Sequence, residues 1–264
     1  MVDIFKQLRR PRQSGRAPAI PAGQRVYAIG DVHGRLDLFG ALVDAIERDD
    51  KARGSMDTTV ICMGDLIDRG PHSARVINAA RAWGEARKVR YLSGNHEEMF
   101  LLSFYRRDVL RNFLKWGGKE TLASYGINGE AFEKASMHKL QEMMLEAVPA
   151  EDRKFLNDFE LMIEIGDYLF VHAGIRPAVE IELQKPHDCR WIRDSFTDFL
   201  GDHGRMVVHG HTITDDPDIR SNRIGIDTGA FRTGVLTALG LQGSERWFIQ
   251  TREDGQVDTF AKAA

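Results

Sequence analysis

The chain has 264 residues, of which 42% are hydrophobic and 28% are charged, and its formal net charge is -3. This length suits one sizeable α/β domain, and the composition excludes a disordered chain or a membrane protein. The slightly acidic balance gives no overall attraction to phosphate backbones, so we expect no nucleic acid partner.

The two cysteines, Cys62 in an apolar run and Cys189 in a polar stretch, do not indicate a disulfide framework. A reducing cytoplasm is therefore the expected location. No apolar stretch is long enough for a signal peptide or a membrane span, so we expect neither export nor a membrane partner. Nothing in the sequence indicates the oligomeric state.

Residues 1–24 mix basic residues with prolines, a combination that disfavours both helix and strand. We predict a flexible basic N-terminal arm there, with a contact arm for a partner or an anionic surface as the alternative. Its basic residues are Lys6, Arg9, Arg10, Arg12 and Arg16. Residues 25–264 are predicted to form a single domain.

Three strand, loop and helix units open that domain. Each has an apolar or β-branched run, then a glycine-containing polar loop, then a helical pattern. The predicted strands, each with the loop that follows it, are 25–29 with 30–34, 58–63 with 64–70, and 89–92 with 93–97. This order predicts an α/β fold whose strands end in functional loops.

Residues 99–158 have an almost wholly helical pattern and predict a helical insert. Within it Phe113, Leu114 and Trp116 are expected to be core side chains, with a wall for the substrate as the alternative. The task of the insert is not indicated by its sequence.

After the insert, the runs at 161–165 and 168–171 predict a hairpin that leads to His172. The last third is then mainly β. Its further predicted strands are 206–208, 223–226, 235–239 and 246–249.

Carboxylate, amide and imidazole side chains come directly after these strands. Gathered at strand ends, they would repel one another or stay unpaired unless cations or hydrogen bonds compensate them. Mixed oxygen and nitrogen donors suit manganese, iron or zinc, and the lack of thiolates argues against a structural zinc site. The residues are Asp31, His33, Asp65, Asn95, His96, His172, His209 and His211.

Five short motifs occur in a fixed order, namely GDVHG, GDLIDRG, GNHE, HAG and GHT. This series resembles that of the PPP metallophosphatases of the calcineurin-like metallophosphoesterase superfamily, especially the bacterial serine/threonine protein phosphatases. The resemblance runs from about Tyr27 to Phe231 and covers the helical insert poorly. It implies a β-sandwich flanked by helices.

The resemblance also implies two divalent metal ions, of which manganese is the first choice and iron or zinc the alternatives. Asp31 and His33 would bind the first metal, Asp65 would bridge the two, and the second would be bound by Asn95, His172 and His211. A hydroxide bridging the metals would attack phosphorus directly.

The same resemblance makes His96 the general acid and Asp68 the acceptor of its second ring N–H. Arg69 would bind phosphoryl oxygens, and Asn95 is also assigned to the substrate phosphate. Arg193 matches a further phosphate-binding arginine more loosely, and a surface salt bridge with Asp194 or a neighbour is the alternative.

His209 lies two positions before His211. On an extended segment both side chains would point the same way, so both could approach the metals. The resemblance selects His211 as the metal ligand. His209 is then expected to contact the ligand residues without binding a metal itself.

The expected activity is hydrolysis of phosphoserine and phosphothreonine in proteins or peptides, with phosphotyrosine left open. An alternative enzyme is a dinucleoside polyphosphate hydrolase such as one for diadenosine tetraphosphate. Asp68 and Glu97 favour the protein phosphatase. A non-catalytic metal-binding scaffold and a nuclease are further readings, which the complete motifs and the acidic balance disfavour.

Overall fold

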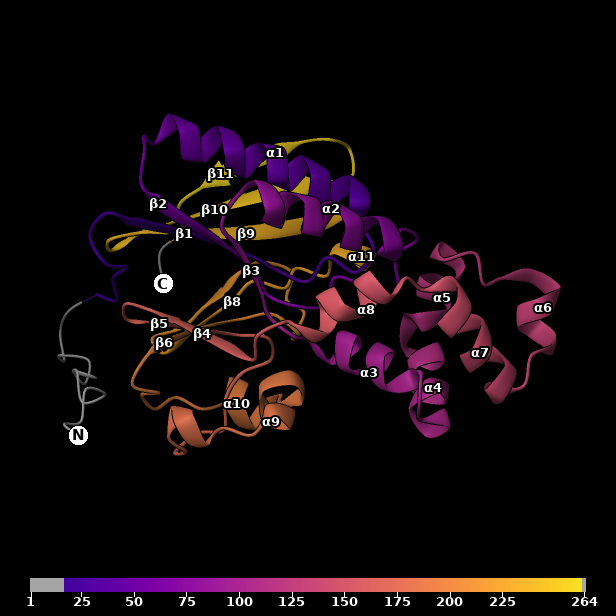
Figure 1. Ribbon diagram of the computed structural model, residues 1–264. Helices are drawn as coiled ribbons and strands as arrows, with labels where there is room; N and C mark the ends of the chain where they lie inside the picture. Colours follow the sequence, from indigo (N-terminus) through magenta and orange to yellow (C-terminus); the bar gives the residue numbers. More distant parts are fainter. Residues whose placement is uncertain (1–16, 263–264) are drawn as a thin grey trace, which may run out of the picture.

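The computed structural model describes residues 17–262, and two β-sheets form its centre (Figure 1). The first sheet has the order β11-β10-β9-β1-β2-β3, and the second has the order β4-β5-β6-β8-β7. The first consists of β1 (Gln24–Ile29), β2 (Asp57–Cys62), β3 (Val89–Tyr91), β9 (Val235–Gln242), β10 (Glu245–Arg252) and β11 (Val257–Phe260). The second consists of β4 (Met162–Ile165), β5 (Tyr168–Val171), β6 (Met206–His209), β7 (Asp218–Ile219) and β8 (Arg223–Gly225).

Strand β1 is buried on both faces, as its run of apolar residues requires. Val26 and Ala28 pack into the core between the two sheets, whereas Tyr27 and Ile29 pack into the core under the helices. Because successive side chains of a strand point to opposite faces, one strand joins the two cores. The predicted fold class, an α/β sandwich flanked by helices, is confirmed.

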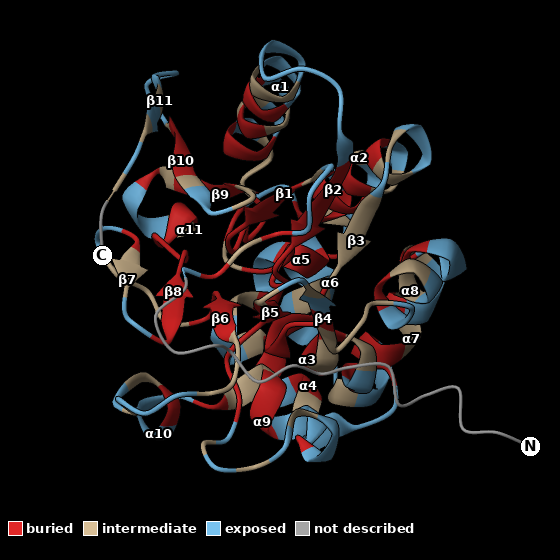
Figure 2. Cartoon of the chain, turned by 90° about the vertical axis from the view of Figure 1, so that its left-hand side faces the viewer, coloured by how far each residue is buried: buried red, intermediate tan, exposed pale blue. Residues whose placement is uncertain are grey.

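Helices cover the outer faces of both sheets. On the first sheet, α1 (Leu36–Ala52) buries Leu38, Phe39 and Leu42, and α2 (Ser73–Ala86) packs beside it. The second sheet carries α9 (Pro186–Trp191) and α10 (Asp194–Thr197), whose Phe196 packs with Val171 and Val207. Figure 2 shows the buried central strands between these partly exposed helices.

The helical insert projects from one end of the sheets (Figure 1). It contains α3 (Asn95–Ser103), α4 (Arg107–Phe113), the π-helical turn η1 (Leu114–Gly118), α5 (Lys119–Ser124), α6 (Gly129–Lys134), α7 (Met137–Ala147) and α8 (Ala150–Asn157). Its first helix begins at Asn95, earlier than predicted, because the Glu97 carboxylate accepts the Gly94 N–H at 3.0 Å.

The hairpin predicted after the insert is confirmed as β4 and β5, with Gly166 at φ +61° in the turn. Strands β7 and β11 were not predicted. The first has only two residues, and the second is a half-exposed edge strand with polar alternation that carries little apolar signal. A short helix, α11 (Ala230–Thr233), precedes β9.

Part of the predicted N-terminal arm is packed onto the domain. Ile20 is buried, its N–H donates to the Gly243 carbonyl at 2.9 Å, and the Ala19 N–H donates to Asp167 at 3.0 Å. Residues 17–23 therefore belong to the folded part. The remainder of the arm, with its five basic residues, lies outside the described residues, and the single domain stays a prediction. Within residues 17–262, none of the helices could span a lipid bilayer.

Candidate metal centre

The polar motif residues meet at one edge of the sandwich. Strands β1, β2 and β3 run parallel to one another, as do β5, β6 and β8, so within each set the carboxyl ends lie side by side. The loops after β1, β2, β5 and β6, together with the start of α3, supply the site. Residues up to 180 positions apart are brought together in this way, as Asp31 and His211 show.

Asp65 is the centre of the arrangement. Its Oδ2 lies 3.7 Å from Nε2 of His33, 3.9 Å from Nε2 of His96 and 3.4 Å from Nε2 of His172. Two buried groups of possible ligand atoms share it, one with His33 and His96 and the other with His172 and His211. A carboxylate common to two groups fits a pair of metal ions.

Backbone carbonyls orient two of these imidazoles. Nδ1 of His33 donates to the Ile67 carbonyl, and Nδ1 of His172 donates to the Met63 carbonyl, each at 2.8 Å. In each ring Nε2 is then the atom that faces Asp65. A backbone acceptor on the far nitrogen is the usual support of a metal-binding histidine.

Two buried atoms of the site have no hydrogen-bond partner among the described residues, Oδ1 of Asp31 and Nε2 of His211. The other carboxylate oxygen of Asp31 accepts the His211 backbone N–H at 3.0 Å, and the side-chain oxygen Oδ1 of Asn95 lies 3.1 Å from Nε2 of His172. Unpaired buried donors and acceptors are costly, and a divalent cation would satisfy both atoms. The residues present therefore fit a dinuclear metal site.

The charges of the site act strongly on one another. Burial raises the pKa of Asp31 well above its usual value, and the carboxylate of Asp227 adds to this. Burial also acts to raise the pKa of Asp65, but the imidazoles of His172 and His96 outweigh it and hold that pKa well below its usual range. Burial lowers the pKa of His211 to about 2, which keeps its imidazole neutral.

The loops hold side chains on a backbone that non-glycine residues rarely adopt. Among the described residues, six non-glycine positions have positive φ, and five are motif residues: His33, Asp65, Asp68, Arg69 and His211. Each such position costs about 1–3 kcal/mol unless the surroundings enforce it, and such strain gathers at functional sites. Close approach is equally demanding, since a Cβ on Gly94 would lie 2.1 Å from Oδ1 of Asp65.

His96 and Asp68 form a buried pair. Nδ1 of His96 donates to Oδ2 of Asp68 at 2.6 Å, and Oδ1 of Asp68 accepts the Thr121 hydroxyl at 2.5 Å. Burial alone would lower the pKa of His96, but the carboxylates of Asp65 and Asp68 outweigh it and raise that pKa. Because Thr121 lies in α5, the helical insert fixes this pair.

Arg69 also contacts the insert. Its N–H donates to the Gly117 carbonyl at 2.9 Å, its guanidinium lies 4.6 Å from the ring centre of Phe231, and Nη1 lies 2.8 Å from Nε2 of His33. A planar guanidinium at this point is suited to phosphate oxygens.

Residues 24–215 match the family model for the calcineurin-like phosphoesterases. The chain belongs to the calcineurin-like phosphoesterase family. With the buried ligand groups described above, this membership makes it a metal-dependent phosphoesterase. The broader part of the expected resemblance is thereby confirmed.

Two curated relatives of this phosphoesterase are bis(5'-nucleosyl)-tetraphosphatases PrpE [asymmetrical]. The protein of Halalkalibacterium halodurans is 29% identical over 247 residues, covering 85% of this chain and 93% of the relative. The protein of Oceanobacillus iheyensis is 24% identical over 249 residues, covering 89% of this chain and 96% of the relative.

Solved structures share the fold of this phosphoesterase. One provisionally described as a diadenosine tetraphosphatase has a TM-score of 0.58 at 18% identity and covers 94% of this chain and 99% of its own. The cold-active protein-tyrosine phosphatase of a Shewanella species has a TM-score of 0.51 at 18% identity and covers 95% and 88%. Identities this low establish the fold alone.

In this phosphoesterase His209 faces away from the ligand groups. Its Nδ1 lies 3.0 Å from the Gly210 carbonyl oxygen, its Nε2 lies 3.3 Å from Nη1 of Arg223, and its ring packs edge-on against Phe196. The expectation that His209 and His211 point the same way requires a regular extended backbone. His211 has φ +61°, which breaks the alternation and turns the two imidazoles apart.

Arg193 is exposed, and its Nη1 lies 3.5 Å from the carbonyl oxygen of His211. Among the described residues it forms no ion pair with Asp194 or with another acidic neighbour, which argues against the surface salt bridge considered from the sequence. The guanidinium therefore lies beside the second ligand group without a carboxylate partner.

Asp227 of this phosphoesterase was not predicted. It is buried in the loop after β8, Oδ1 accepts the Gly229 N–H at 2.9 Å, and burial raises its pKa to about 6. It acts on the charge of Asp31. The signal was available, because Gly225-Ile226-Asp227-Thr228-Gly229 repeats the pattern of a strand followed by an acid and a glycine.

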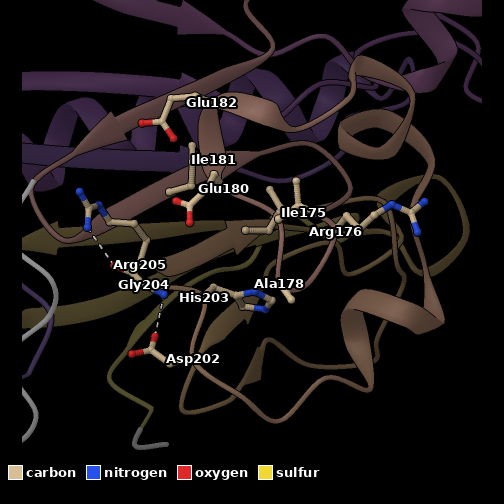
Figure 3. Close-up of a pocket in the computed structure, with 11 residues that line it drawn as sticks. Ile175, Arg176, Ala178, Glu180, Ile181, Glu182, Asp202, His203, Gly204 and Arg205 are labelled. Atoms are coloured by element: carbon tan, nitrogen blue, oxygen red, sulfur yellow. Dashed lines mark hydrogen bonds between the residues drawn. The ribbon is translucent and has the colours of Figure 1, made fainter.

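A separate hollow has a volume of about 390 Å³ and is lined by residues within 175–182 and 202–205. Figure 3 shows these residues. None of its lining residues belongs to the two ligand groups. Arg176 points away from it and pairs with Asp188, and Arg205 pairs with Glu164. The hollow is therefore distinct from the metal centre.

Proposed function

We propose that this phosphoesterase hydrolyses dinucleoside polyphosphates and cleaves bis(5'-nucleosyl) tetraphosphates asymmetrically, into a nucleoside monophosphate and a nucleoside triphosphate. The observation that carries the proposal is the likeness to asymmetrical bis(5'-nucleosyl)-tetraphosphatases over 85% of this chain and 93% of the relative from H. halodurans. These relatives favour the alternative prediction over the protein phosphatase.

Glu97 and Asp68, the two residues that favoured the protein phosphatase, form hydrogen bonds with other residues of this protein. The Glu97 carboxylate accepts backbone N–H groups of Asp65, Leu66 and Gly94, and Asp68 accepts from His96. Both roles serve any phosphoester, because neither side chain is shown to face a leaving group. Their presence therefore does not distinguish a protein substrate from a nucleotide.

One metal would be held by Asp31 and His33, and the other by Asn95, His172 and His211. Asp65 would bind both metals. The donor chemistry and the unpartnered atoms of Asp31 and His211 support this assignment. When bound, two divalent ions supply Lewis acidity and an activated water, and manganese is the metal to test first.

His96 is proposed as the proton donor to the leaving oxygen. Asp68 holds Nδ1, so the proton to be given sits on Nε2, which lies on the Asp65 side of the ring. The Asp68 carboxylate, 2.6 Å from Nδ1, favours the imidazolium form that a general acid needs. Because Nε2 also belongs to the first ligand group, the test must separate proton donation from metal binding.

Arg69, Asn95 and Arg193 are proposed to bind the polyphosphate. Nη1 of Arg69 contacts Nε2 of His33 in the first ligand group. Nη1 of Arg193 contacts the backbone carbonyl oxygen of His211 in the second. Two guanidinium groups beside the two ligand groups are suited to a chain of phosphates, which carries more charge than a single phosphomonoester.

The test compares diadenosine tetraphosphate with a phosphoserine peptide and a phosphotyrosine peptide, each with Mn²⁺ and at equal concentration. Asymmetrical cleavage of diadenosine tetraphosphate should give AMP and ATP in equal amounts, which product analysis measures. Two ADP molecules would mean symmetrical cleavage, and a preferred phosphopeptide would return the assignment to a protein phosphatase. The Asp65→Asn variant is the control for contaminating activity.

A further inference from the structure

Trp116 differs from the other three tryptophans of the chain. The indole N–H groups of Trp83, Trp191 and Trp247 donate to Glu47, Glu98 and Asp49. The indole N–H of Trp116 donates to no acceptor among the described residues, and 54% of the residue is exposed. The indole ring is therefore accessible to a ligand.

The backbone places Trp116 next to the catalytic loop. Its neighbour Gly117 accepts the Arg69 N–H at 2.9 Å, and a Cβ on Gly117 would lie 2.6 Å from Cγ of Arg69. Consecutive Cα atoms are 3.8 Å apart, so the Trp116 backbone is also close to Arg69. Arg69 in turn contacts His33 of the first ligand group.

The turn that carries Trp116 is irregular and well anchored. Trp116 has φ -100° and ψ 19°, and Gly117 has φ +106°, which interrupts the helix between α4 and α5. On either side Phe113 and Gly118 are buried in the insert. The expectation of core side chains is thus correct for Phe113, whereas Trp116 is turned outward at the border of insert and site.

We propose that Trp116 is the stacking platform for one nucleobase of the substrate, an inference that rests on the proposed dinucleotide activity. Every base has a face that can stack on an indole, while Arg69 beside it contacts the phosphates. Nζ of Lys115 lies 5.9 Å from the centre of the indole ring and adds a positive charge that would attract the phosphates of the substrate. One rigid turn thereby connects base recognition to phosphate binding.

The test measures KM and kcat for diadenosine tetraphosphate with Mn²⁺ in the wild type, Trp116→Ala and Trp116→Phe. Loss of one stacked base predicts a KM about tenfold higher in Trp116→Ala, and Trp116→Phe should keep most of the affinity. Inhibition by inorganic tetraphosphate, which has no base, should be the same in all three. Melting temperatures check that the variants are folded.

Tyr105→Ala is the matched control. Tyr105 is 77% exposed on the same insert, but it lines another hollow with Ala150 and Arg153. Its KM should equal that of the wild type.

An unchanged KM in Trp116→Ala, or an equal loss of inhibition by inorganic tetraphosphate, overturns the stacking role while leaving the dinucleotide activity in place. A wild type that does not cleave diadenosine tetraphosphate overturns both proposals.

Discussion

The carboxylate of Glu97 accepts the backbone N–H of Asp65 at 2.9 Å, so the first turn of α3 fixes the loop that carries Asp65, the residue common to both ligand groups. The same side chain also accepts from Leu66 at 2.8 Å and from Gly94 at 3.0 Å. Glu97 is fully buried, and its role is to hold two loops at a set distance.

Glu97→Gln should therefore weaken the fold and the site together. Glutamine offers one acceptor oxygen to three N–H groups and turns an N–H₂ toward at least one of them, which costs about 2 kcal/mol of unfolding free energy. Urea unfolding measures the loss. Glu98→Gln, on the same helix but only partly buried, should lose less, and equal losses would contradict this account.

His96→Asn should separate turnover from metal binding. General acid catalysis contributes about 100- to 10,000-fold, so kcat should fall within that range while the bound manganese per chain stays the same. Metal analysis and kinetics on one preparation check both numbers. Loss of one metal ion per chain would make His96 a ligand instead. Adding Asp68→Asn should cause little further loss, because the two residues act as a pair.

Metal binding should stabilise the fold through Asp65. A cation that binds the native state alone stabilises it by an amount that grows with the logarithm of its concentration relative to Kd, so the melting temperature rises, and chelation reverses the rise. Asp65→Asn should lose most of the manganese-dependent rise, since Asp65 belongs to both ligand groups. Differential scanning calorimetry with and without Mn²⁺ measures it, and an undiminished rise would exclude Asp65 from the centre.

Asp227→Asn should weaken metal binding although Asp227 is not a proposed ligand. The variant removes a buried negative charge that acts on Asp31, and supporting groups of this kind change metal affinity about 10- to 100-fold. Titration with Mn²⁺ followed by calorimetry gives the affinity. Wild-type affinity in Asp227→Asn would limit this carboxylate to its contact with the Gly229 N–H.

The ion pairs of Asp50, which is not a residue of the metal centre, should make the stability of the fold depend on pH. Its carboxylate binds Arg25 at 2.6 Å and Arg87 at 2.9 Å. Burial acts to raise its pKa, but the hydrogen bonds from Arg25, Thr58 and Arg87 outweigh it and lower that pKa. Because the folded pKa is below the unfolded value of about 3.9, this stabilisation is present above pH 4 and is lost as the pH falls further.

Asp50→Asn should accordingly cost about 3 kcal/mol at pH 7, because the fully buried Arg25 loses its counter-charge. The difference from the wild type should shrink as the pH is lowered through the folded pKa of Asp50. Denaturant unfolding of both proteins at pH 7, 4 and 3 measures this difference in unfolding free energy. A difference that stays the same at all three pH values would rule out the charge effect.

Most of the strands and helices, and the expectation of a metal centre at the strand ends, follow from the amino-acid sequence. Strand alternation and helical spacing are local properties, so the strands before Asp31, Asp65 and His172 and the helical insert could be read from neighbouring residues. Carboxylates and imidazoles directly after strands pointed to metal binding because such groups are costly to bury without a cation.

Only the folded chain shows which side chains meet in the two ligand groups and what surrounds them. His209 and His211 separate because of one positive φ, and Asp31 meets His211 across 180 residues through the order of the strands. Such contacts depend on sheet topology and on backbone strain enforced by packing, neither of which is encoded in a local window of sequence. For the same reason Trp116, helical by pattern, proved to be an exposed residue next to Gly117, whose backbone contacts Arg69.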